Sequence, residues 1–104
     1  MTKRATVAGF TLLLCSCVTD SFRPPPVSPA LVARARVDHA TAQELSAGRS
    51  LFAGRCLNCH TLPRTTAYSR EQWTDLVSRM AARANLTPAE QRSVLAYLRA
   101  AATH

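Results

Sequence analysis

The residues of this chain best suited to chemistry are two cysteines and a histidine, in the order Cys56-Leu57-Asn58-Cys59-His60. This C-x-x-C-H spacing is the attachment signature of c-type haem. Its two thiols can form thioether bonds to the two vinyl groups of one haem, and the adjacent histidine can bind the iron as proximal ligand. The motif therefore predicts one covalent haem c on Cys56 and Cys59, with His60 on the iron.

Two other chemistries use closely spaced cysteines and stay open as alternatives. A thiol redox pair of the thioredoxin type belongs to a βαβ context, and no strand-like stretch surrounds Cys56. A structural zinc site needs further ligands at matching spacing. His39 and His104 have no companion histidine at such a spacing, and both other cysteines lie near the N-terminus. Haem attachment is therefore favoured over zinc binding and thiol chemistry.

The N-terminus predicts export from the cytoplasm. Lys3 and Arg4 precede an apolar run over residues 5–14, which is too short to span a bilayer and is typical of a secretory signal. Covalent haem attachment in bacteria takes place outside the cytoplasm, so an export signal agrees with the motif. Residues 1–16 are therefore expected to be a signal peptide.

The end of this signal resembles the lipobox of bacterial lipoproteins. Leu14-Cys15-Ser16-Cys17 makes Cys17 the expected lipidation site, with Cys15 as an alternative. A soluble periplasmic protein cut near this point is the other interpretation. Val18 stands where an Asp commonly marks retention in the inner membrane, so the expected location is the outer membrane, on the periplasmic side.

Residues 17–38 are interpreted as a lipidated N-terminus followed by a proline-rich linker. Pro24, Pro25, Pro26 and Pro29 favour an extended, polyproline-like backbone. About twenty such residues span at most ~65–70 Å. A helical turn or two is expected over residues 30–37, and the folded domain is expected over residues 39–104.

Three helices are predicted in that domain, because three capping boxes mark helix starts. Their cap and acceptor residues are Thr41 and Glu44, Ser69 and Gln72, and Thr87 and Glu90. The first helix is predicted over residues 42–53 and the third from Pro88 to about residue 102. The second carries a stripe of Trp73, Leu76, Val77 and Met80. No stretch alternates long enough for a strand, so the predicted class is all-α.

With these elements the chain resembles the small class I bacterial cytochromes c over about residues 40–102. In that family the N-terminal helix ends in C-x-x-C-H and crosses the C-terminal helix at a glycine–aromatic contact. Gly48 and Phe52 match the first helix, and Tyr97-Leu98 matches the second. The resemblance implies three main helices around one covalently bound haem.

The resemblance also implies a methionine as the distal iron ligand, shortly before the C-terminal helix. Met80 fits that place and is the only thioether after Met1. The alternative is a core side chain on the helical stripe, since methionine often fills gaps in cores. Nineteen residues separate His60 from Met80, fewer than is usual, and Met80 is predicted within a helix. An open iron site therefore stays possible, and His39 and His104 are less favoured ligands.

The charge pattern bears on partners. From Cys17 onward the chain has eleven arginines, no lysine and six acidic residues, a net charge of +5. A positive face would steer an acidic redox partner. The arginines considered for a rim near the haem are Arg49, Arg55, Arg64, Arg79 and Arg83. No nucleic-acid-binding motif is present, and membrane association would come from the lipid.

These observations predict a single-haem protein of the cell envelope that transfers one electron at a time between partner proteins. The sequence shows no pairing of nucleophile and base or of two acids, so an enzyme is not expected. Two alternatives remain: a haem-based ligand-binding or sensing subunit with an open iron site, and the electron-accepting subunit of a periplasmic dehydrogenase.

Overall fold

The computed structural model describes Gly9, residues 23–56 and residues 62–102, and every regular element within these ranges is a helix. This confirms the predicted all-α class for the described part of the chain. None of these helices is long and apolar enough to cross a membrane. In order they are α1 (Pro29–Ala35), the short 3-10 helix η1 (Arg36–Asp38), α2 (Ala42–Arg55), the 3-10 helix η3 (Thr65–Ala67), α3 (Arg70–Met80) and α4 (Pro88–Ala101).

The three predicted capping boxes all form and begin α2, α3 and α4. At the start of α2, Thr41 Oγ1 accepts a hydrogen bond from the Glu44 N–H at 3.1 Å, and Glu44 Oε2 accepts one from the Thr41 N–H at 2.9 Å. Each box satisfies N–H groups that the helix itself leaves unpaired. The first helix runs to Arg55, two residues beyond its predicted end.

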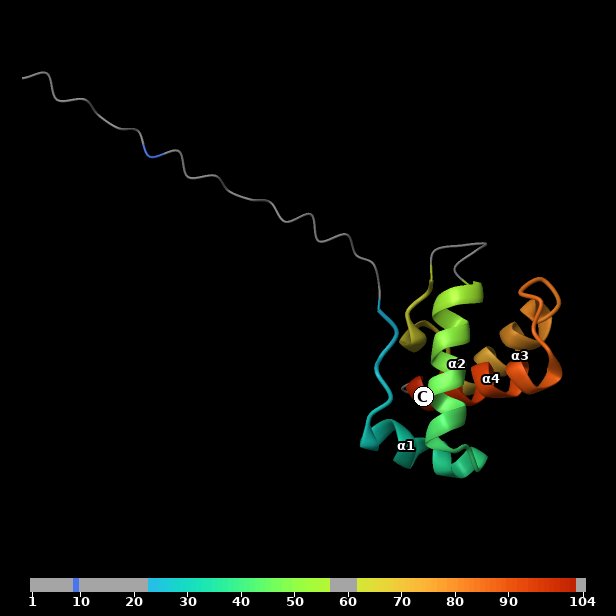
Figure 1. Ribbon diagram of the computed structural model, residues 1–104, viewed down its shortest axis with the longest axis horizontal. Helices are drawn as coiled ribbons and strands as arrows, with labels where there is room; N and C mark the ends of the chain where they lie inside the picture. The colour runs from blue at the N-terminus through green and yellow to red at the C-terminus, as the bar shows by residue number, and fades with distance from the viewer. Residues whose placement is uncertain (1–8, 10–22, 57–61, 103–104) are drawn as a thin grey trace, which may run out of the picture.

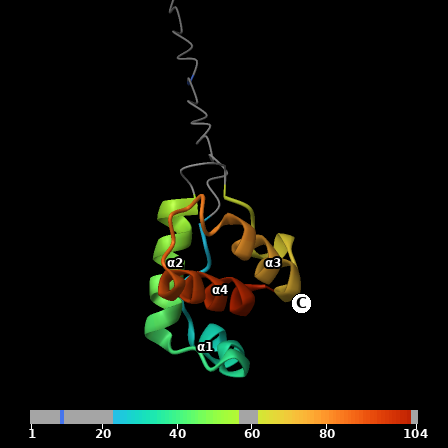
Figure 2. The same cartoon turned by 90° about the vertical axis from the view of Figure 1, so that its right-hand side faces the viewer.

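Helix α4 lies at the centre of the fold and packs against α1, α2 and α3. Figure 1 shows α2 running steeply across α4, with α3 to one side, and Figure 2 shows the same crossing from the side. The largest fully buried side chains come mainly from α2 and α4: Tyr97, Phe52, Leu45, Leu98 and Val94.

The crossing of α2 and α4 depends on a close approach at Gly48. A Cβ atom on Gly48 would lie 2.0 Å from the Ser93 carbonyl oxygen and 2.9 Å from Tyr97 Cβ. Nearby, the rings of Phe52 and Tyr97 have their centroids 6.4 Å apart. The predicted glycine–aromatic contact is confirmed, and the α4 backbone at Ser93 is a further part of it.

The N-terminal segment differs from the linker predicted there. Residues 24–28, here called the N-terminal strap, lie along the domain, and Pro24 is buried. Arg49 donates to the carbonyl oxygens of Pro24 and Pro25, with Nη2 2.9 Å from the first and Nε 3.0 Å from the second. Tyr97 donates its hydroxyl proton to Pro25 O at 2.6 Å. An extended proline backbone leaves its carbonyls unpaired, which makes them available to such donors.

The strap leads directly into α1, which is also part of the packed domain. Ser28 caps this helix by accepting from the Leu31 N–H. Leu31 and Ala35 are buried, and α1 packs against α4. The expected helical turns over residues 30–37 are thus confirmed, but residues 24–38 belong to the domain and not to a linker.

Candidate functional site

An apolar pocket opens beside the C-terminal end of α2. It encloses about 480 Å³ of empty space, a volume that includes open solvent. Its described lining carries no charged side chain and comes from α2, α3, α4 and the segments between them. The lining residues are Phe52, Cys56, Pro63, Trp73, Leu76, Val77, Met80, Ala84, Leu86, Val94 and Leu98.

Cys56 joins the predicted motif to this pocket. It is the capping residue that follows α2, it is half-buried, and it lines the pocket. Cys59 and His60 lie outside the described residues, as do Cys15, Cys17 and His104.

Helix α3 supplies one wall of the pocket through its apolar stripe. Trp73, Leu76, Val77 and Met80 recur at the i, i+3, i+4, i+7 spacing, and all four line the pocket. The stripe prediction is therefore confirmed. Met80 is the last residue of α3 and is half-buried, which also confirms its predicted place in a helix.

Trp73 is held in a fixed orientation on this wall. Its Nε1–H donates to the Thr65 carbonyl oxygen at 2.8 Å. Its ring packs edge to face against Phe52 and Tyr68, with centroids 6.0 and 5.0 Å away. The contact with Tyr68, the residue before the cap of α3, forms a hydrophobic staple at the start of this helix. A buried indole with its N–H satisfied is a rigid apolar surface for whatever occupies the pocket.

A charged contact ties the end of α2 to the segment after α3. Arg55 Nη1 donates to the Asn85 carbonyl oxygen at 2.7 Å and to Glu90 Oε1 at 3.1 Å, and Nη2 lies 3.1 Å from Glu90 Oε2. Ala84 and Leu86, on either side of Asn85, line the pocket. We call this contact the Arg55 latch, because it holds the pocket-lining segment against the helix that leads into Cys56.

Glu90 serves both the latch and the capping box of α4. The hydrogen bond from the Thr87 backbone N–H lowers the pKa of Glu90 most; partial burial opposes this, and the nearby Arg55 charge lowers the pKa further. Glu90 was recognised in the sequence as a capping residue. Its pairing with Arg55, 35 positions away, follows no local pattern, so sequence reasoning missed it.

Among the arginines considered for a positive rim, Arg49, Arg55 and Arg79 contact carbonyl or carboxylate oxygens of the described residues. Arg49 binds the strap, Arg55 forms the latch, and Arg79 pairs with Asp75 one helical turn away. Arg64 and Arg83 are exposed. The positive rim stays a prediction, and Arg49, Arg55 and Arg79 also have structural contacts.

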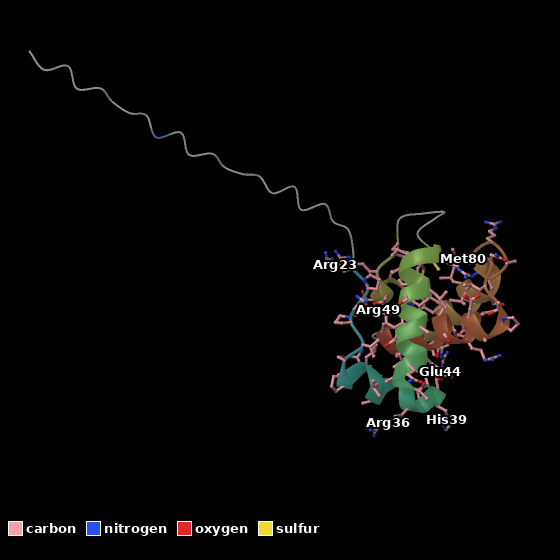
Figure 3. All side chains as sticks on the ribbon, in the orientation of Figure 1. Arg23, Arg36, His39, Glu44, Arg49 and Met80 are labelled. Carbon is pink, nitrogen blue, oxygen red and sulfur yellow. The ribbon has the colours of Figure 1, made fainter. Side chains whose placement is uncertain are left out.

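His39 lies away from the pocket. It is exposed, has a left-handed φ of 55° and ends η1. Figure 3 shows His39 and Met80 at opposite ends of the molecule. His39 is thereby removed as a candidate ligand for a group in this pocket.

The side chains that line the pocket suit an apolar group that contains a metal better than they suit a bare metal ion. Within residues 23–56 and 62–102, no three His, Cys, Asp or Glu side chains gather in a way that could hold a metal ion. The donors that line the pocket there are the sulfur atoms of Cys56 and Met80, surrounded by carbon. A methionine thioether can ligate the iron of a haem, and a cysteine thiol can form a thioether bond to a haem vinyl group.

Comparisons of the chain with protein-family models, curated proteins and solved structures found no match.

Proposed function

We propose that this protein is a single-haem electron carrier of the cell envelope with a class I cytochrome c-like fold. One observation carries the proposal: Cys56, the first residue of C-x-x-C-H, and Met80 line the same apolar pocket. They reach it from different helices, 24 positions apart in sequence. A zinc or thiol site would require neither the apolar enclosure nor the methionine.

Each residue has a defined part in this proposal. Cys56 and Cys59 hold the haem through thioethers, His60 is the proximal ligand and Met80 the distal one. The haem, when bound, supplies a one-electron change at iron. Phe52 and Trp73 keep water from the pocket, and an apolar surrounding disfavours the more highly charged state. Together with His/Met ligation this raises the reduction potential.

The proposed location follows from the N-terminal sequence. Residues 1–16 direct export, and a lipid on Cys17 attaches the protein to the periplasmic side of the outer membrane. Labelled fatty acid should enter the wild type and Cys15→Ser but not Cys17→Ser. Labelling that is lost in Cys15→Ser and kept in Cys17→Ser would show that the lipid is on Cys15 and not on Cys17.

The proposed haem can be tested through its covalent attachment to the chain. Protein matured in a host with periplasmic haem attachment should keep its haem through acid–acetone extraction and on denaturing gels. Cys56→Ser and Cys59→Ser should each lose one thioether, whereas Cys15→Ser should keep both. Purified protein that contains zinc and lacks haem would overturn the proposal.

A second candidate function, ligand binding at an open iron site, is favoured by the placement of Met80. Its direction is set by the last turn of α3, whereas a loop residue could adjust to the iron. If the thioether stays off the iron, the ferric protein will be high-spin and the ferrous protein will bind carbon monoxide at once. A low-spin spectrum in both oxidation states supports the electron carrier.

A further inference from the structure

The strap fixes the point at which the chain leaves the domain. Three donors, Arg49 Nε, Arg49 Nη2 and the Tyr97 hydroxyl, bind the carbonyl oxygens of Pro24 and Pro25. Tyr97 is itself fully buried against α2, so its hydroxyl is held in place. The strap is therefore held by side chains of both crossing helices, Arg49 of α2 and Tyr97 of α4.

The exit point lies at the pocket end of the molecule. Figure 3 labels Arg23 and Met80 at one end, near the C-terminal end of α2, and Arg36 and His39 at the other. Figure 2, turned about the vertical axis, shows the start of the blue strap and the C-terminal end of α2 at that same end. Arg23 is exposed there.

Docking of the strap shortens the tether. Cys17 precedes Arg23 by six positions, so a lipid on Cys17 and the exit point are at most ~22 Å apart along a fully extended chain. The linker predicted from sequence would have allowed about three times that reach. Exposed Arg23 and the net charge of +5 also favour approach to an anionic bilayer surface.

We propose that the strap turns the pocket end of the domain toward the membrane that holds Cys17, and that the redox partner is a protein embedded in that membrane. This rests on the proposed lipid anchor and haem. For a partner dissolved in the periplasm, the pocket end would face the nearby bilayer and be hard to reach. A partner embedded in the membrane would meet the pocket end by lateral diffusion in the bilayer.

The experiment uses the haem-loaded lipoprotein in vesicles of phosphatidylcholine with a few per cent of a lipid whose headgroup carries a diazirine. After illumination, mass spectrometry gives the ratio of crosslinks at residues 81–87, beside the pocket, to crosslinks at residues 34–39, at the far end. We expect a severalfold excess at the pocket end. A Gly/Ser insertion of ten residues between residues 22 and 23 lengthens the tether without touching the strap and should bring the ratio towards one.

The double variant Arg49→Gln/Tyr97→Phe releases the strap while keeping the buried ring, and should also bring the ratio towards one. An equal ratio in the wild type, with lipid present on Cys17 and an unaltered haem spectrum, overturns this inference and leaves the electron carrier standing. Absence of lipid on Cys17 rejects the anchor together with the inference. Should the double variant fail to fold, the insertion variant alone decides.

Discussion

At the scale of single residues, the distal ligand is the sharpest test of the proposed function. Met80 shares the pocket with Cys56, and thioether sulfur on ferric haem gives a weak absorption band at ~695 nm. We expect this band in the wild type and its loss in Met80→Ala, with a lower reduction potential and binding of added imidazole. Absorption spectra and a redox titration measure these changes.

Leu76→Ala is the matched control for Met80→Ala. Leu76 lies on the same stripe of α3 and lines the same pocket, but it offers the iron no ligand. The band should persist in this variant. Identical spectra and potentials in wild type and Met80→Ala would make Met80 a core residue only, and the open iron site would become the better hypothesis.

The Arg55 latch gives a second prediction at this scale. Arg55→Gln removes the charge that binds Glu90 and Asn85, so we expect the free energy of unfolding to fall by about 1 kcal/mol. The segment after Met80 should also loosen, which speeds replacement of the thioether by imidazole. Denaturant titration and stopped-flow absorption measure the two effects.

The control for the latch is Arg79→Gln. Arg79 pairs with Asp75 on the exposed face of α3, and pairs of this kind contribute at most about 0.5 kcal/mol. Its loss should leave imidazole binding unchanged. Equal imidazole rates in Arg55→Gln and wild type would show that the latch does not hold the Met80 segment.

At the scale of helices, the crossing of α2 and α4 predicts opposite effects at two glycines of one helix. Gly48→Ala places a Cβ against the Ser93 carbonyl, which forces the helices apart and should cost about 2–4 kcal/mol. Gly54→Ala meets nothing within 4 Å and should gain up to about 1 kcal/mol from helix propensity. Thermal and denaturant unfolding of both variants measure the difference. A tolerated Gly48→Ala would contradict the close approach.

The helices were predictable because their signals are local. A capping box spans four residues, and the α3 stripe spans eight, so both can be read from a short window of sequence. The end of α2 was predicted two residues early, which is within the usual spread of helix ends. The contacts of Arg55 with Asn85 and Glu90, from beyond α3, carry no local signal in the sequence.

At the scale of the whole molecule, the sequence did not predict that the strap packs against the domain. Three consecutive prolines are typical of a solvated linker, and no neighbouring residue indicates which side chains bind their carbonyl oxygens. The partners are Arg49 and Tyr97, 24 and 72 positions from Pro25. Part of the pocket was predictable, because the motif and the α3 stripe both supply lining residues. The lining residues Pro63, Ala84 and Leu86 were not predicted, since their segments show no periodic pattern.

The buried hydroxyl of Tyr97, which binds the strap, makes the fold less stable at high pH. Burial raises the pKa of Tyr97 to about 12, which the nearby Arg49 charge partly opposes. The folded state therefore holds this proton more tightly than the unfolded state. The stabilisation is complete below the ordinary pKa of 10.0 and is lost as the pH rises through about 12. Unfolding followed from pH 9 upward should show this decline in wild type and a shallower one in Tyr97→Phe, and parallel curves would contradict it.

The strap also determines which contacts bear the load when force is applied to the N-terminus. Force applied at Arg23 acts first on the hydrogen bonds that Arg49 and Tyr97 make to the carbonyl oxygens of Pro24 and Pro25. Behind them, Ser28 and Leu31 fasten α1. The pocket lining contains none of these residues. If Cys17 carries the proposed lipid, tension from the membrane would therefore detach the strap before it distorted the walls of the pocket.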